Sequence, residues 1–143
     1  MNMTIAVRYQ SRGGNTKAVA NAIAKAAGVM AEPILVPIEE PVDLLFVGGG
    51  VYAWDIDRSL KKFLKSLTPE TVKSVAAFTT AGRMDKTNKI TALVKANGIN
   101  VRDETLPVKV YLRNHASLGG KGYLNLSDKQ IQDIEDFVRR ILT

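Results

Sequence analysis

Residues 9–16 read Tyr-Gln-Ser-Arg-Gly-Gly-Asn-Thr, and this stretch decides the fold. It follows the apolar run Thr4 to Tyr9, which is typical of a strand, and it leads into Thr16 to Ala27, where apolar residues recur at helical spacing. Two consecutive glycines, Gly13 and Gly14, let the backbone turn sharply between the two elements. The sequence therefore predicts a strand, a tight loop and a helix that ends at Gly28.

The predicted loop is suited to hold a phosphate. A helix N-terminus offers unpaired N–H groups and partial positive charge, and the Ser11 and Thr16 hydroxyls and the Asn15 amide can add hydrogen bonds. The same residues could instead do no more than cap the helix. Two other phosphate-binding motifs fit worse. The ATPase loop needs a Lys-Ser or Lys-Thr pair after the glycines, and the dinucleotide-binding fingerprint needs three glycines at fixed spacing; the sequence has neither.

The rest of the chain continues the alternation of strand and helix. Further strands are predicted at 32–36, 43–49 and 72–80, with a fifth in two pieces at 99–101 and 108–111, and further helices at 59–67, 86–96 and after Ser127-Asp128. This order predicts one α/β domain over residues 1–143, a doubly wound parallel sheet with helices on both faces. Pro37 to Val42 is too short for a connecting helix, so we expect one sheet face to be thinly covered there.

Composition narrows the function. The net charge is +6 and the sequence pI is about 9.7, but basic and acidic residues are interspersed, so we do not expect a nucleic-acid partner from charge alone. The absence of cysteine excludes thiolate metal sites, and the lone His115 excludes a histidine-rich one. The sequence has neither an apolar run of membrane-spanning length nor a signal-peptide pattern, so we expect a cytoplasmic protein without membrane contact.

Six residues of the first loop and helix resemble the opening signature of the flavodoxin family, namely Tyr9, Ser11, Gly14, Thr16, Ala20 and Ile23. The resemblance implies a five-stranded parallel sheet with strand order 2-1-3-4-5, an FMN cofactor, and a phosphate held by Ser11, Arg12, Gly13, Gly14, Asn15 and Thr16. The sequence departs from the family pattern at two positions. Arg8 stands at a normally apolar place, and Gly13 replaces a frequent hydroxyl residue.

The resemblance also implies that two later loops hold the flavin ring. The first comprises Val51, Tyr52, Ala53 and Trp54, with Tyr52 as the stacking aromatic, Ala53 as the small residue at the flavin N5, and Trp54 as the alternative stacker. The second comprises Thr80, Ala81, Gly82 and Met84. Either aromatic could instead simply cover the edge of the sheet. The stretch Leu112 to Asn125 has no clear pattern, and His115 within it is expected to be solvated.

These features favour an FMN-binding electron carrier that exchanges electrons with a redox partner protein. A reductase of a small-molecule acceptor such as a quinone is the first alternative, and a cofactor-free binding module is the second. Typical flavodoxins are acidic, whereas this chain is basic, so the family's usual partners do not carry over. The oligomeric state is open.

Overall fold

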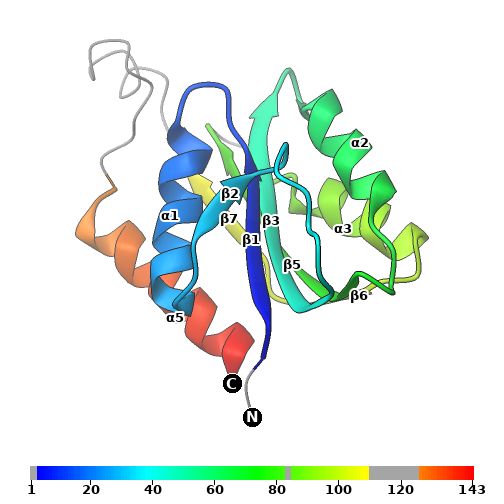
Figure 1. Ribbon diagram of the computed structural model, residues 1–143. Coiled ribbons are helices and arrows are strands. Elements are labelled where there is room, and N and C mark those ends of the chain that lie inside the picture. Colours follow the sequence, from blue (N-terminus) through cyan, green and yellow to red (C-terminus); the bar gives the residue numbers. More distant parts are fainter. Residues whose placement is uncertain (1–2, 83–84, 110–125) are drawn as a thin grey trace.

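A parallel sheet runs through the middle of the computed structural model, which describes residues 3–82, 85–109 and 126–143 (Figure 1). Its strands are β1 (Ile5–Gln10), β2 (Ala31–Pro33), β3 (Val42–Tyr52), β4 (Asp55–Ile56), β5 (Val72–Ala81), β6 (Asn100–Val101) and β7 (Leu106–Lys109). The order is β2-β1-β3-β5-β6, with β7 also beside β5. All of these neighbours pair in parallel. The predicted doubly wound α/β fold is confirmed.

The strand boundaries differ from the prediction in three places. β3 continues past Gly49 to Tyr52 and then forms an antiparallel hairpin with β4, which the sequence pattern did not predict. β2 ends at Pro33 because the chain turns there, with the Val36 N–H donating to the Pro33 carbonyl. Pro107 lies inside β7, opposite Thr79, rather than between two pieces of strand. A proline fits there because β7 pairs with β5 alone among the described strands.

Helices cover both faces of the sheet, as expected (Figure 1). One face carries α1 (Asn15–Ala27) and α5 (Asp128–Leu142), and the other carries α2 (Arg58–Ser66) and α3 (Thr87–Ala96). On the first face, fully buried residues such as Phe46 of β3 pack between the sheet and the helices. The Phe46 ring meets the Phe137 ring of α5 edge-on, with 5.9 Å between the ring centres. The second face is closed by Leu45, Leu60 and Ile90, all fully buried. Among the described residues, no helix is both long and apolar enough to cross a membrane.

Arg8 supports the connection between β2 and β3, where the fold has no helix. The chain passes from β2 to β3 without one, as the short connection predicted. The Arg8 side chain lies beneath this connection and is only 8% exposed. Its Nε donates to the Val36 carbonyl at 2.9 Å and its Nη2 to the Pro37 carbonyl at 3.1 Å. An arginine therefore stands at a normally apolar strand position because its guanidinium hydrogen-bonds backbone carbonyls that no helix satisfies.

Candidate functional site

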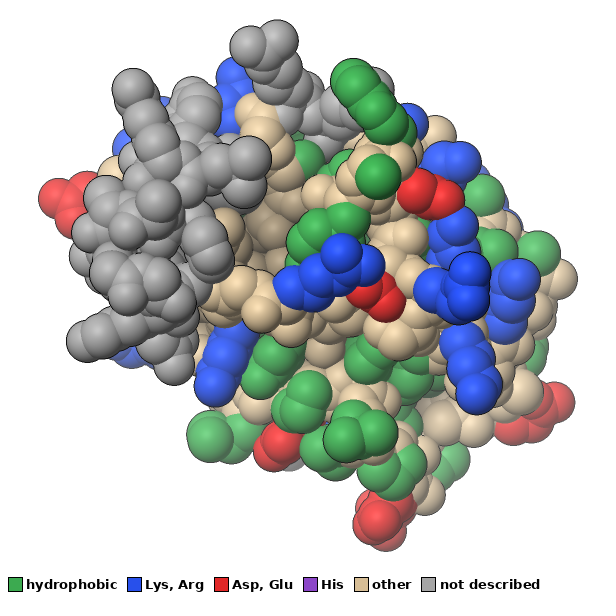
Figure 2. Space-filling view, turned by 90° about the horizontal axis from the view of Figure 1, so that it is seen from above, with side chains coloured by type: hydrophobic (Ala, Val, Ile, Leu, Met, Phe, Trp, Pro, Cys, Tyr) green, Lys and Arg blue, Asp and Glu red, His purple; other side chains and the backbone are tan. Residues whose placement is uncertain are grey.

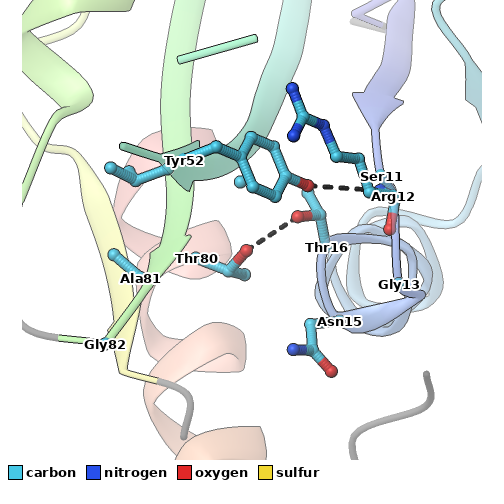
Figure 3. A pocket seen from close by; sticks show the side chains of 11 residues that line it. Ser11, Arg12, Gly13, Asn15, Thr16, Tyr52, Thr80, Ala81 and Gly82 are labelled. Carbon is cyan, nitrogen blue, oxygen red and sulfur yellow. Dashed lines mark hydrogen bonds between the residues drawn. The ribbon is translucent and has the colours of Figure 1, made fainter. Parts of the chain in front are cut away.

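A cleft of about 440 Å³ lies where β1, β3 and β5 end. In open parallel sheets this edge is where ligands bind, at the point where the strand order reverses, and the volume is typical of small-molecule sites. The lining combines most of the predicted residues with one that the sequence analysis missed, Gly50 (Figure 3): Ser11, Arg12, Gly13, Asn15, Thr16, Gly50, Val51, Tyr52, Thr80, Ala81 and Gly82.

The first loop is organised around Gly14. This glycine is the N-cap of α1 and has a φ of 97°, a left-handed conformation that glycine adopts without strain. Its N–H donates to Ser11 Oγ at 2.9 Å, so the Ser11 hydroxyl stabilises the loop and still has a proton to donate. Helical geometry leaves the N–H groups of the first helical residues, Asn15 and Thr16, without intrahelical partners. The loop therefore presents backbone donors, as an anion site requires.

Two threonine hydroxyls join the first loop to the last strand of the site. Thr16 Oγ1 lies 2.7 Å from Thr80 Oγ1, and the two residues are 1% and 4% exposed. One hydroxyl must donate in this bond, so the other keeps its proton for a further acceptor. Nearby, the buried Asn15 Oδ1 has no hydrogen-bond partner within the described residues. Unpaired buried polar atoms are uncommon in folded proteins, so this oxygen can accept a hydrogen bond from a donor that the described residues do not supply.

Tyr52 is held across the cleft by the first loop (Figure 3). The Arg12 N–H donates to the Tyr52 hydroxyl at 3.2 Å, and the Arg12 guanidinium carbon lies 3.9 Å from the centre of the Tyr52 ring. The same guanidinium pairs with Asp57 through Nε at 2.9 Å and Nη2 at 2.8 Å. Tyr52, Arg12 and Asp57 thus form a continuous chain of contacts from the cleft to the start of α2.

Asp57 has two roles in this series of contacts. It is the N-cap of α2, where its carboxylate accepts bonds from the Ser59 N–H at 2.8 Å and the Ser59 hydroxyl at 2.6 Å. The Ser59 hydroxyl and, to a smaller extent, Ser59 N–H and Arg12 hold the pKa of Asp57 below its ordinary value. Asp57 is therefore ionised at neutral pH and balances the charge of Arg12.

The position of Tyr52 explains why Gly50 is a glycine. A Cβ at position 50 would lie 2.5 Å from the Tyr52 hydroxyl oxygen, so a side chain there would force the Tyr52 ring out of its position. Similarly, a Cβ at Gly48 would lie 2.2 Å from the Phe78 carbonyl oxygen of the neighbouring strand. The run Gly48-Gly49-Gly50 is the signal in the sequence that side chains are excluded along this strand. It could have identified Gly50 as part of the site.

Ala53 and Trp54 form the turn between β3 and β4 and do not line the cleft. Their φ angles are 49° and 73°, the left-handed values that a two-residue hairpin of type I′ requires. Trp54 is 72% exposed. Met84 and His115 lie outside the described residues.

No group of His, Cys, Asp or Glu suited to a metal ion occurs within residues 3–82, 85–109 and 126–143. Among the described lining residues of the cleft, Arg12 is the one charged side chain.

A sequence comparison shows the family of the chain, and comparisons with solved structures show its fold. The sequence profile described as "Flavodoxin domain" matches residues 6–117, and the chain belongs to this flavodoxin family. No curated protein matches it by sequence.

Three solved structures show the same fold across nearly the whole chain. The structure of a flavodoxin from the domain Archaea has a TM-score of 0.73 at 19% identity, covering 99% of this chain and 100% of that one. The two-electron reduced Megasphaera elsdenii flavodoxin has a TM-score of 0.65 at 14% identity, covering 95% and 98%. An NAD(P)H:quinone oxidoreductase from Methanothermobacter marburgensis has a TM-score of 0.52 at 13% identity, covering 98% and 97%.

Proposed function

We propose that this protein binds FMN in the cleft between β1, β3 and β5 and acts as an electron carrier. The observation that carries the proposal is the first loop. It places backbone donors and the Ser11 and Thr16 hydroxyls at a helix N-terminus, in a cleft that two other strand ends complete. The family supports the same assignment.

The residues present fit both ends of FMN. The phosphate would be held by Ser11 to Thr16, where the partial positive charge of α1 and its free N–H groups favour an anion. The flavin ring would lie beside Tyr52 and meet backbone groups of Thr80 to Gly82. Since Arg12 covers one face of the Tyr52 ring, a stacked flavin would use the other face.

Tyr52 also adds a donor to the phosphate end. Its hydroxyl accepts the Arg12 N–H and keeps its own proton. The Arg12 N–H belongs to the loop that would hold the phosphate. Tyr52 occupies this N–H, but its own hydroxyl proton offers a hydrogen bond in its place. Tyr52 would therefore contribute to both ends of the site, through its ring and through its hydroxyl.

The character of the cleft favours a carrier. FMN itself supplies one- and two-electron chemistry when bound, and the protein's task is to hold it and limit the access of water. Among the described lining residues there is no carboxylate, histidine or lysine to move a proton. The second candidate is a reductase of a small acceptor such as a quinone. It is favoured by Ala81, which carries only a methyl group, and Gly82, which has no side chain, because they leave space along the β5 side of the cleft.

Titration of the apoprotein with FMN and with riboflavin tests the proposal. FMN is expected to bind at least about a hundredfold more tightly, because riboflavin loses several hydrogen bonds to a charged group at roughly 1.5–3 kcal/mol each. Thr16→Val is expected to weaken FMN binding more than riboflavin binding, whereas Thr91→Val on α3 is expected to change neither. Equal affinities would contradict the phosphate assignment, and binding of neither flavin would favour the cofactor-free alternative.

A further inference from the structure

A second depression, a groove of about 610 Å³, adjoins the cleft. The two share Ser11, which lines both. The groove runs between the start of the β2–β3 connection and helix α2, and the residues that line it include Ser11, Ile34, Leu35, Lys62 and Phe63.

The floor of this groove is apolar because of the missing helix. The connection from β2 to β3 crosses the sheet face without a helix, so Ile34 and Phe63 stay only partly buried. Leu35 is 89% exposed, the largest exposure among the big hydrophobic side chains of the described residues. Exposed leucines are common singly, but here the side chain lies beside a half-buried isoleucine and phenylalanine in one groove.

Helix α2 places positive charge along one side of the groove, which Lys62 lines. Helix α2 has the sequence Arg-Ser-Leu-Lys-Lys-Phe-Leu-Lys-Ser and contains no acidic residue. Arg58, Lys62 and Lys65 are exposed and lie at i, i+4 and i+7, so they form a stripe about 10 Å long. Within the described residues, none of the three forms an ion pair, whereas the neighbouring Lys61 pairs with Asp55.

The basic stripe begins beside the cleft, because Arg58 directly follows Asp57, which pairs with Arg12 of the cleft. Figure 2 looks onto the edge where the strands end. Lys and Arg side chains gather on its right-hand side, where α2 lies, and hydrophobic side chains, with some acidic ones beside them, lie in the lower part of the view. No acidic residue is among the described residues that line the groove. An apolar centre with a charged, solvent-exposed rim is the usual composition of a transient protein interface.

We propose that this groove and the stripe Arg58, Lys62 and Lys65 form a docking surface for an acidic partner protein that inserts an apolar side chain against Leu35 and Phe63. Charge complementarity selects the partner, because unpaired cations around an apolar floor attract a negative surface and repel a positive one. A partner seated here contacts the Ser11 loop at the border of the cleft. That the partner exchanges electrons rests on the proposed function, but the docking surface does not.

Binding to apoprotein tests the surface without FMN. The probes are a plant-type ferredoxin, which is acidic, and cytochrome c, which is basic, each titrated calorimetrically at low and at high salt. Ferredoxin is expected to bind at low salt and weaken as salt rises, because exposed charges are screened. Lys62→Glu is expected to weaken binding about tenfold, and Leu35→Ser is expected to weaken it without changing the salt dependence.

Lys25→Glu is the matched control. Lys25 is exposed in the last turn of α1. Its substitution by glutamate changes the net charge as much as Lys62→Glu does, but at the opposite edge of the sheet. Equal losses in Lys25→Glu and Lys62→Glu would show that only the overall charge matters and would overturn the proposal. Preference for cytochrome c, no ferredoxin binding, or an unchanged affinity in Leu35→Ser would also overturn it. A protein that binds ferredoxin in this way but not FMN would refute the proposed function alone.

Discussion

The Arg12 guanidinium lies 3.9 Å from the centre of the Tyr52 ring, and the backbone N–H of the same arginine donates to the hydroxyl of that tyrosine. Arg12 thus contacts both the ring face of Tyr52, through its guanidinium, and the Tyr52 hydroxyl, through its backbone N–H. A cation over an exposed ring contributes about 0.5–1 kcal/mol. Because Asp57 fixes the guanidinium from the other side, the position of Tyr52 is set before any cofactor binds.

Tyr52→Ala is expected to weaken FMN binding by roughly 1–3 kcal/mol, the range found for a base stacked on an aromatic ring, and to brighten the fluorescence of residual bound flavin. Tyr52→Phe keeps the ring and is expected to lose less. Trp54→Ala is the control, because Trp54 is exposed and does not line the cleft. If fluorescence titration shows that Tyr52→Ala leaves FMN affinity unchanged while Trp54→Ala lowers it strongly, then Trp54 and not Tyr52 stacks on the flavin.

The pKa of Asp57 gives a prediction about acid stability. Its folded pKa is lowered, chiefly by the Ser59 hydroxyl, so the carboxylate stabilises the fold above the unfolded pKa of about 3.9. That stabilisation is lost as pH falls through the folded pKa. Ser59→Ala is therefore expected to raise the pKa of Asp57 and shift acid unfolding to higher pH.

Carboxyl NMR titration and acid-unfolding curves measure this effect. Ser66→Ala is the matched control, because the Ser66 hydroxyl at the other end of α2 donates to the Phe63 carbonyl and not to a carboxylate. An unchanged Asp57 titration in Ser59→Ala would contradict the assigned cause.

Arg8→Met is expected to destabilise the protein by about 1.5–3 kcal/mol in urea unfolding. The substitution keeps an apolar stem but leaves the Val36 and Pro37 carbonyls without their charged donor. Lys25→Met, which removes an exposed charge, is expected to change stability by less than about 0.5 kcal/mol. Equal stability of Arg8→Met and the native protein would show that the connection is held by its apolar contacts alone.

Ala53→Gly is expected to stabilise the protein by about 0.5–1 kcal/mol. A left-handed conformation costs a non-glycine residue roughly 1–2 kcal/mol, and the added freedom of glycine in the unfolded chain offsets part of the gain. The same substitution at Ala92, exposed in helix α3, is expected to destabilise by about 1 kcal/mol. Thermal unfolding that moves in the same direction for both variants would contradict a left-handed turn at Ala53.

Much of the fold could be predicted from local pattern. Gly28 ends α1, and the predicted cap at Ser127 is confirmed as a capping box, with Ser127 Oγ accepting from the Gln130 N–H and Gln130 Oε1 from the Ser127 N–H. The hairpin from Tyr52 to Asp55 was not predicted, because Ala-Trp is not a usual turn pair. Its geometry is imposed by strand pairing rather than by the residues in the turn.

The sequence by itself determined the order of strands and helices and the loop from Ser11 to Thr16, which we propose holds a phosphate. These depend on periodicity and on glycines, which act over a few residues. The tertiary structure alone decided that Arg12 meets Asp57, 45 residues away, and that Thr16 meets Thr80, 64 residues away. It also brought Arg8 under Val36 and made room for Tyr52 above Gly50. Such contacts depend on how strands are placed side by side, and no local pattern records that placement.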